Sequence, residues 1–443
     1  MFLTEKIQNI YISILNRLYS CYAVRMDKKA KEAYMLCIFM ALAASFLLIF
    51  SNRMSALASF TLTLRNIFTG VMLLLVSLFS MEGSLRPVGW RWSIMLPYYL
   101  GAMGLVITGT IHPIGDGYFS FGVMMLLVYP CLYIVWNNRG DYEALFDIIA
   151  KANEIVGVAA FVLCMISRPA EVFQLISWGV GVHGGYANSN LFSMSGMCLA
   201  CAAIYMIYRE SADAKKRGIH FACLLIGAFI VIIGQSRASF AIIVASTIVS
   251  LWYYRKNNSV SSGIMTKKTA LIIALASVAF VTALILVISA NSEGGIVSKF
   301  SSDGKTLDGY MSGRITLWSS YASHLNLLGN DFDATDWMAL TGGLGHAHNN
   351  FLEFGYRCGV PVALTFLLLD LFSGIRALTY LFSRKYSRDC YLFTIIFMGM
   401  YALESMVDIA TIPMERQAPF FFYIIICVFL DAEQEGTSRD GRA

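Results

Sequence analysis

The chain has 443 residues, of which 57% are hydrophobic and 14% charged, with a formal net charge of +5 and a mean hydropathy of +0.63. Soluble globular domains carry roughly 25% charged residues, so this composition excludes a water-soluble protein and predicts one that lies in the lipid bilayer. The positive charge falls in short segments between apolar runs, so it is no evidence for a nucleic acid partner, and none is expected.

Apolar runs of about 20 residues recur along the whole chain, which is the length a helix needs to cross a bilayer. They predict an all-α polytopic membrane protein of about 12 transmembrane helices, with residues 1–443 forming a single integral membrane domain. The predicted spans are 34–51, 67–82, 92–111, 118–136, 145–166, 190–208, 219–234, 238–254, 269–290, 358–381, 390–409 and 418–431.

Most of the 33 Lys and Arg residues fall in alternate segments between these spans. Because positively charged loops are retained in the cytoplasm, this pattern places both termini inside. Residues 291–357, between spans nine and ten, then form one large extracytoplasmic loop that contains short helices. Five of the six histidines also fall outside, so chemistry is expected on the outer face.

The first polar motif on that face is Gly184-Gly185-Tyr186-Ala187-Asn188-Ser189-Asn190, at the start of span six. Asn188 can cap the following helix, because an N-cap side chain accepts a hydrogen bond from a first-turn N–H group. Capping explains the motif without further function; the alternative is that Asn188 and Asn190 bind substrate. Farther along the same span, Cys198 and Cys201 are interpreted as small packing residues.

The second motif is the short turn Gly234-Gln235-Ser236-Arg237, which joins spans seven and eight. It places Arg237 at the start of a helix, where the helix dipole favours an anion over a cation. One interpretation is an interfacial arginine on lipid headgroups. The other is that the guanidinium and the helix N–H groups together bind a phosphate.

The third motif, Ser312-Gly313-Arg314, lies in the large loop and precedes an amphipathic stretch whose apolar face is Ile315, Leu317, Trp318 and Tyr321. Ser312 is the expected N-cap, and Arg314 is again a cation in the first turn. Two arginines in this position on the same face indicate a shared anion such as a diphosphate.

The fourth motif runs from Gly342 to Glu353 and contains His346, His348 and Asn349. Its glycines permit turns that present N–H groups to an anion, and a helix is expected to begin at His348 or Asn349. His348 is then expected to share a helix face with Leu352, and Glu353 either pairs with Arg357 at i,i+4 or contacts substrate. His348 either acts in catalysis or is a loop histidine without a role. A zinc site at His346 and His348 lacks further ligands at regular spacing, so no metal is predicted.

These four motifs, in this order and on one face, resemble the O-antigen ligase and O-antigen polymerase superfamily of GT-C membrane glycosyltransferases. That family shows a G-x-x-x-N-x-N turn, an S-R at a span start, an S-G-R in the external loop and a closing H-N-x-x-L-E. The family turn often reads N-P-N, whereas this chain has Asn188-Ser189-Asn190. The resemblance covers nearly the whole chain.

The resemblance implies an enzyme of the bacterial cytoplasmic (inner) membrane whose active site faces outward. It would transfer glycan from a polyprenyl-diphosphate-linked oligosaccharide donor to an acceptor sugar hydroxyl, with inversion and with no cofactor or metal. By position, Arg237 and Arg314 would hold the diphosphate and His348 would act on the acceptor. Asn349, Glu353, Asn188, Asn190, Ser312 and His346 would contact substrate, and a chain-length regulator or a flippase would be the protein partner.

Three functions fit this chain. A polymerase extends another lipid-linked repeat unit and is the favoured interpretation, while a ligase transfers finished glycan to lipid A core, protein or wall polymer. A transporter or lipid-linked glycan flippase is the third, because Lys151, Glu154, Glu404 and Asp408 are ionisable residues inside or near spans. Transporters of this size usually contain paired repeats, and the sequence contains none.

Overall fold

A computed structural model of the chain describes residues 6, 9–17, 29–30, 32–37, 39–40, 92–112, 118–123, 125–126, 142–167, 169–170, 181–184, 189–210, 213–257, 306–310, 313–330, 347–383, 388–406 and 425–426. Within these ranges all regular secondary structure is helical, with no strand. The helices are α4 (Trp92–Ile111), α6 (Tyr142–Ser167), α8 (Ser189–Arg209), α9 (Ala214–Gly234), α10 (Arg237–Asn257), α13 (Leu307–Tyr310), α14 (Arg314–Ser323), α16 (Asn350–Arg357), α17 (Val360–Ser383) and α18 (Arg388–Ser405).

Seven of the predicted spans coincide with helices, namely α4, α6, α8, α9, α10, α17 and α18. Three helical segments in the described ranges are long and apolar enough to cross a membrane: Glu143–Ile166, Ser189–Arg209 and Ala214–Gly234. The chain is therefore an α-helical membrane protein. The spans predicted at 67–82 and 269–290 lie outside the described residues, as do most of 34–51, 118–136 and 418–431.

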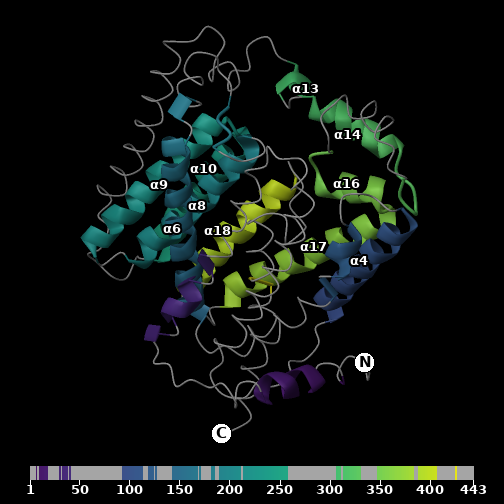
Figure 1. The fold of residues 1–443 in the computed structure, drawn as a ribbon, viewed down its shortest axis with the longest axis horizontal. Coiled ribbons are helices and arrows are strands. Elements are labelled where there is room, and N and C mark those ends of the chain that lie inside the picture. The colour runs from purple at the N-terminus through teal and green to yellow at the C-terminus, as the bar shows by residue number, and fades with distance from the viewer. Residues whose placement is uncertain are drawn as a thin grey trace.

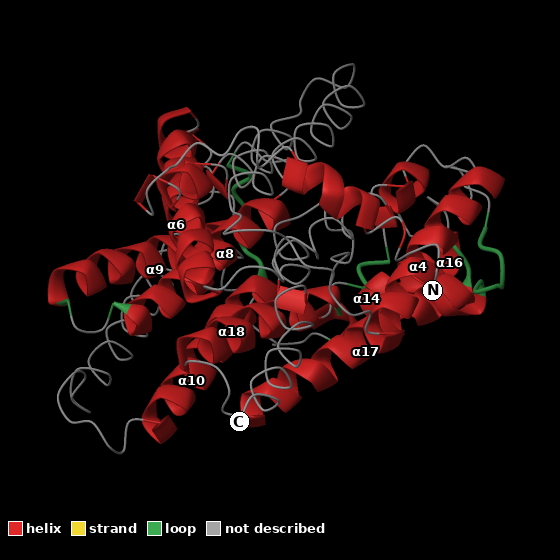
Figure 2. Cartoon of the chain, turned by 90° about the horizontal axis from the view of Figure 1, so that it is seen from below, coloured by secondary structure: helices red, strands yellow, loops and turns green. Residues whose placement is uncertain are grey.

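Figure 1 shows α6, α8, α9 and α10 gathered on one side of the molecule and α4, α14, α16 and α17 on the other. Helix α18 runs between the two groups in this view and in the view turned by 90° (Figure 2). It packs against α10, α8 and α6 and also contacts α17. The hydroxyl of Tyr401 in α18 donates a 3.1 Å hydrogen bond to Asp370 in α17. Helix α18 therefore joins the two groups.

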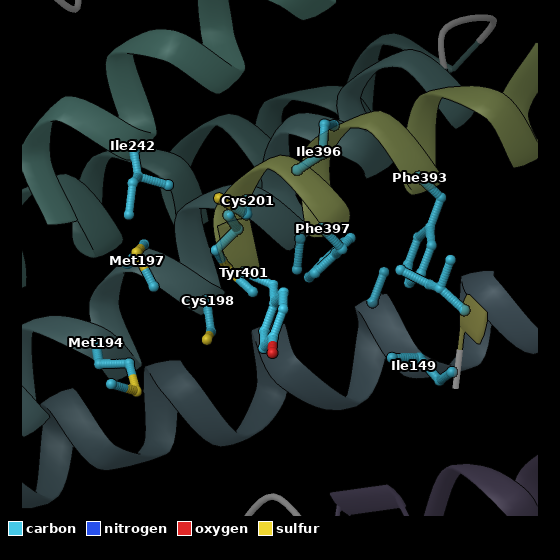
Figure 3. Close-up of a cluster of buried hydrophobic side chains, with 14 of the residues drawn as sticks. Ile149, Met194, Met197, Cys198, Cys201, Ile242, Phe393, Ile396, Phe397 and Tyr401 are labelled. Carbon is cyan, nitrogen blue, oxygen red and sulfur yellow. The ribbon is translucent and has the colours of Figure 1, made fainter. Parts of the chain in front are cut away.

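The main hydrophobic core lies where α18 meets α6, α8 and α10 (Figure 3). Phe393 stacks on Phe146 with ring centroids 4.1 Å apart and meets Tyr205 edge-on at 5.1 Å. Cys198 and Cys201 are buried in this core as free cysteines, which confirms their interpretation as packing residues. The apolar window of α8 is 100% buried, so this span is enclosed by protein on all sides.

Small residues let α8 and α9 approach closely. A Cβ added to Gly227 would lie 2.6 Å from the Gly196 carbonyl oxygen, and one added to Gly196 would lie 2.8 Å from the Gly227 carbonyl oxygen. Both distances are shorter than a Cβ atom tolerates, so the interface requires glycine at both positions. Contacts between small residues are the usual way for helices to associate in lipid, where the hydrophobic effect does not drive their association.

A stripe of ionisable residues runs along one face of α6, with Glu143, Asp147, Lys151 and Glu154 at helical spacing. Arg209 of α8 pairs with Glu143 at 3.0 Å and with Asp147 at 3.0 Å, and the Tyr205 hydroxyl donates to Asp147 at 2.8 Å. Glu210 lies 4.0 Å from Lys151 and 3.0 Å from Lys216. These pairs fasten the predicted cytoplasmic ends of α6, α8 and α9 to one another.

The deepest member of the stripe is Glu154, whose two carboxylate oxygens lie 2.8 and 2.9 Å from Nδ1 of His220 in α9. Both side chains are less than a tenth exposed. Ionisable groups at membrane depth are tolerated when they pair with one another. The pair therefore accounts for Glu154 as a contact between α6 and α9.

Candidate functional site

Arg237 is the first residue of α10, as predicted, and its side chain is half-buried. The Ser236 side chain caps this helix: its Oγ accepts from the Ser239 N–H at 3.4 Å and donates to the Ser239 hydroxyl at 3.0 Å. Gln235 ends α9 in the left-handed region with φ 60°. The turn between α9 and α10 is therefore tight, and it fixes the backbone that carries Arg237.

The Gly-rich segment before α8 packs against this turn. The Val182 N–H donates to the Ile233 carbonyl at 2.9 Å, and Gly181 lies so close to Gly234 and Ser189 that a Cβ would meet both at about 3 Å. Asn190, half-buried, is in the first turn of α8. The segment before α8 thus lies against both the start of α8 and the end of α9 that leads into α10. Asn188 lies outside the described residues.

Arg314 is the first residue of α14, but the predicted cap is wrong. The N-cap is Gly313, in the left-handed region with φ 77° and without a side-chain hydrogen bond, so Ser312 precedes the cap position. The carboxylate of Asp308 takes over the capping: it accepts from the N–H groups of Ile315 at 2.8 Å and Thr316 at 3.2 Å. Ser312 itself lies outside the described residues.

Asp308 also accepts a hydrogen bond from the Thr316 hydroxyl. This bond, together with the two backbone N–H groups, holds the pKa of the Asp308 carboxyl below its usual range. The first turn of α14 therefore already holds a carboxylate, and a phosphate next to Arg314 would be bound through the guanidinium.

His348 precedes α16 and has φ 49°. Left-handed backbone is uncommon outside glycine and costs on the order of 1–3 kcal/mol. Asn349 is the N-cap, and its Oδ1 accepts from Phe351 N at 3.0 Å and Leu352 N at 3.1 Å. The predicted start of this helix is confirmed. The expectation that His348 and Leu352 share a helix face is wrong, because His348 lies before the cap.

Glu353 forms the predicted i,i+4 ion pair with Arg357, at 2.5 Å, and both side chains are buried. Its second oxygen, Oε2, accepts from the Ala347 N–H at 2.7 Å. The alternative in which Glu353 pairs within its helix is therefore confirmed. The carboxylate faces the loop backbone from a side chain with 0% exposure, so a direct contact with substrate would require this arrangement to open.

The two loop helices pack through a small cluster of Leu317, Tyr321, Ala347, Leu352 and Tyr356. The Trp318 indole donates to the Ala347 carbonyl at 2.8 Å. Trp318 follows Arg314 by one helical turn, and Ala347 is the residue before His348, so this bond brings the segments of Arg314 and His348 together. The Asn349 amide donates to the Met406 carbonyl at 3.4 Å, which attaches the loop to the end of α18.

The predicted site residues thus form two groups in the described ranges. Asn190 and Arg237 belong to the α8–α9–α10 group, while Arg314, His348, Asn349 and Glu353 belong to the loop helices, with α18 in contact with both. That Arg237, Arg314 and His348 meet in one cavity stays a prediction. His346 lies outside the described residues, and no cluster of metal-ligating side chains occurs in the part that the structure describes.

Two residues that hold this loop assembly together are not predicted from the sequence. Asp308 belongs to no motif, and Trp318 is predicted only to lie on an apolar helix face. An indole N–H donates one hydrogen bond and usually finds a partner when buried, so a tryptophan in a polar loop is a signal for a contact of this kind. Asp308 carries no such signal, because its partners lie seven and eight residues away in the sequence.

No protein-family model matches the chain, and no curated protein matches it.

Proposed function

We propose that the protein is a membrane glycosyltransferase that uses a polyprenyl-diphosphate-linked glycan as donor. The observation that carries the proposal is His348, a half-buried histidine in left-handed backbone, on a loop assembly that also contains Arg314. Strained backbone in an otherwise regular helical protein is typical of functional sites. Arg237, at the start of α10, supplies a second cation on the same predicted face.

In the proposed reaction the acceptor hydroxyl oxygen attacks the anomeric carbon of the donor sugar, and the bond from that carbon to the phosphate oxygen breaks. The hydroxyl proton passes to the imidazole of His348, the side-chain type best suited to general-base work at neutral pH. The polyprenyl diphosphate leaves with the bonding electrons, and Arg237 and Arg314 stabilise its charge. A direct displacement of this kind inverts the configuration at the anomeric carbon.

Asn349, Asn188, Asn190, Ser312 and His346 are proposed to contact substrate. Glu353 is proposed to act on the loop backbone instead, because its carboxylate is bonded to Ala347 and Arg357. The proposed location is the outer face of the bacterial cytoplasmic membrane, as implied by the family resemblance.

The transport alternative draws on ionisable residues inside spans. Two of these have defined partners, Lys151 with Glu210 and Glu154 with His220. Such pairs explain the charges as helix contacts, and this favours the enzyme over the transporter. Polymerase and ligase share the donor chemistry, and we propose the polymerase.

The proposal is tested by reconstituting the protein in liposomes with a polyprenyl-diphosphate oligosaccharide. We expect Arg237→Ala, Arg314→Ala and His348→Ala each to lower glycan transfer by at least about 100-fold, since each removes a charge or base used in the transition state. Lys215→Ala is the matched control, because Lys215 is exposed on the predicted inner side. Undiminished transfer by all three variants would reject the mechanism.

The same assay separates the candidate functions. A ladder of products longer by whole repeat units, formed from lipid-linked repeats alone, identifies a polymerase. Transfer that requires added lipid A core, protein or wall polymer identifies a ligase. Movement of the lipid-linked oligosaccharide across the bilayer without any transfer would support the flippase.

A further inference from the structure

The peptide groups next to His348 are held from both sides by side chains of two helices. The Ala347 N–H donates to Glu353 of α16 at 2.7 Å, and the Ala347 carbonyl accepts from the indole of Trp318 of α14 at 2.8 Å. Ala347 is 0% exposed, its bond to Glu353 is buried and its bond to the Trp318 indole is partly buried, so losing either partner would be costly. The backbone on the N-terminal side of His348 is therefore fixed in place.

The acceptor of the first bond is itself fixed. Glu353 and Arg357 form a buried ion pair, and the Arg357 guanidinium lies 5.9 Å from the centre of the Tyr118 ring. A charged acceptor makes a stronger hydrogen bond to a backbone N–H than a neutral one. Glu353 is therefore a rigid anchor for Ala347.

The residue after His348 is anchored as well. Asn349 caps α16 through two bonds to backbone N–H groups and donates to the Met406 carbonyl at the end of α18. His348 is thus a single left-handed residue between two fixed neighbours. Its φ of 49° is maintained because the bonds on either side outweigh the conformational cost.

Trp318 also belongs to the helix that begins with Arg314. Four residues of α-helix rise about 6 Å, so Arg314 lies one turn from the indole that bonds to Ala347. A change at Trp318 would therefore alter the placement of the His348 backbone relative to Arg314.

We propose that Trp318 and Glu353 are positioning residues that set the His348 imidazole relative to Arg314 by clamping the Ala347 peptide. This inference rests on the proposed glycosyl transfer, in which His348 is the base. Catalytic groups must be held close to the productive geometry, and a displacement of about 1 Å can cost about 100-fold in rate. Neither residue needs to touch substrate.

The test compares Trp318→Phe with Trp252→Phe in the liposome assay. Phenylalanine keeps an aromatic ring at position 318 but lacks the indole N–H, so the Ala347 carbonyl loses its partner. We expect Trp318→Phe to lower kcat by at least about tenfold with the KM for the donor unchanged, because the displaced base slows only the chemical step. Trp252, 59% exposed on α10, is the control and should retain wild-type kcat.

Amide hydrogen exchange of the peptide that spans Ala347 gives a second readout. Trp318→Phe and Glu353→Gln should both speed exchange at Ala347 and leave the exchange of α8 unchanged, which shows that the membrane helices remain folded. The increase should be smaller for Glu353→Gln, because the new amide oxygen can still accept the N–H bond although Arg357 loses its counter-ion. Unchanged exchange at Ala347 in both variants would overturn the clamp.

The outcomes separate the two proposals. If His348→Ala keeps full transfer, the proposed function fails. A second outcome is that His348→Ala is inactive while Trp318→Phe keeps wild-type kcat or loses activity only in proportion to its unfolded fraction. In that case the proposed function stands, and the bonds to Ala347 have no positioning role.

Discussion

The two ends of the helix bundle hold their polar residues in different ways. At the predicted inner end, ionisable side chains pair across α6, α8 and α9, from Glu143 with Arg209 to the buried contact of Glu154 with His220. At the predicted outer end the backbone itself is irregular. Every residue with positive φ in the described ranges lies there: Gly184, Gln235, Gly313, Gly329, His348 and Gly359.

The difference separates the ionisable pairs that join the spans from the irregular segments that carry the predicted catalytic residues. Ion pairs between helices need only regular helical backbone, and they stabilise the packing of the spans. A non-glycine residue in left-handed backbone costs free energy and persists only where the surrounding structure holds it. Two of these residues, Gln235 and His348, are not glycine. Both lie within or next to the segments that carry the predicted catalytic residues.

The largest expected effect on stability concerns the inner end. Glu154→Ala leaves the buried His220 ring without its hydrogen-bond partner, and leaving a buried polar group unpaired in this way costs about 1–3 kcal/mol. The free energy of unfolding in mixed micelles measures this loss. Transfer activity per folded molecule should be unchanged, because the pair lies away from the proposed site.

Two variants control this experiment. Glu143→Ala removes a partly exposed member of the same stripe and should cost less than about 1 kcal/mol. Replacing both Glu154 and His220 by leucine should recover most of the stability, since no polar group is then left buried without a partner. Equal losses for Glu143→Ala and Glu154→Ala would contradict the distinction between buried and exposed pairs.

The second effect concerns the strained histidine. At position 348, where φ is 49°, the Gly variant should be more stable than the Ala variant by about 1 kcal/mol, because only alanine suffers the left-handed clash. At His324, where φ is −111°, the order should reverse, since glycine there only adds freedom to the unfolded chain. Thermal unfolding of the four variants measures both differences.

Neither variant at position 348 should transfer glycan, so release of the strain and loss of activity would occur together. If the alanine variant were the more stable one at position 348 as well as at position 324, the backbone at His348 would not be strained.

The smallest effect concerns pH and Asp308. Because the folded pKa of this carboxyl is lowered, its contribution to holding the first turn of α14 is complete above the ordinary carboxyl range and is lost as the pH falls through the lowered folded value. Amide exchange of residues 315–317, corrected for the intrinsic pH dependence, measures the transition. Thr316→Val removes the hydroxyl whose hydrogen bond lowers the Asp308 pKa most, so the midpoint of the transition should move to higher pH. A midpoint unchanged by Thr316→Val would show that this hydroxyl does not lower the Asp308 pKa.

The helices are the part of this fold that can be predicted from sequence. Spans such as 92–111 coincide with observed helices because about 20 apolar residues in a row have few alternatives in lipid. Asn349 can be recognised near the start of α16, and Glu353 with Arg357 as a pair, because both depend on spacing within one helix.

The predictions that fail depend on distant residues. The sequence favours Ser312 as the cap of α14, and Asp308 caps it instead, from a separate short helix. Ala347, the neighbour of the left-handed His348, bonds to Trp318 of α14 and to Glu353 of α16. No local pattern records such contacts, because they form only after the loop helices have packed.

The enclosure of α8 has a consequence for biogenesis. A span whose apolar window is 100% buried must still enter the bilayer as it emerges from the ribosome, before α10 and α18 have been synthesised. Its small and weakly polar residues, including Ser193, Ser195 and Gly196, then face lipid until later helices cover them. Closure of the core therefore waits for residues 388–405, which makes the docking of α18 a late step in the assembly of the bundle.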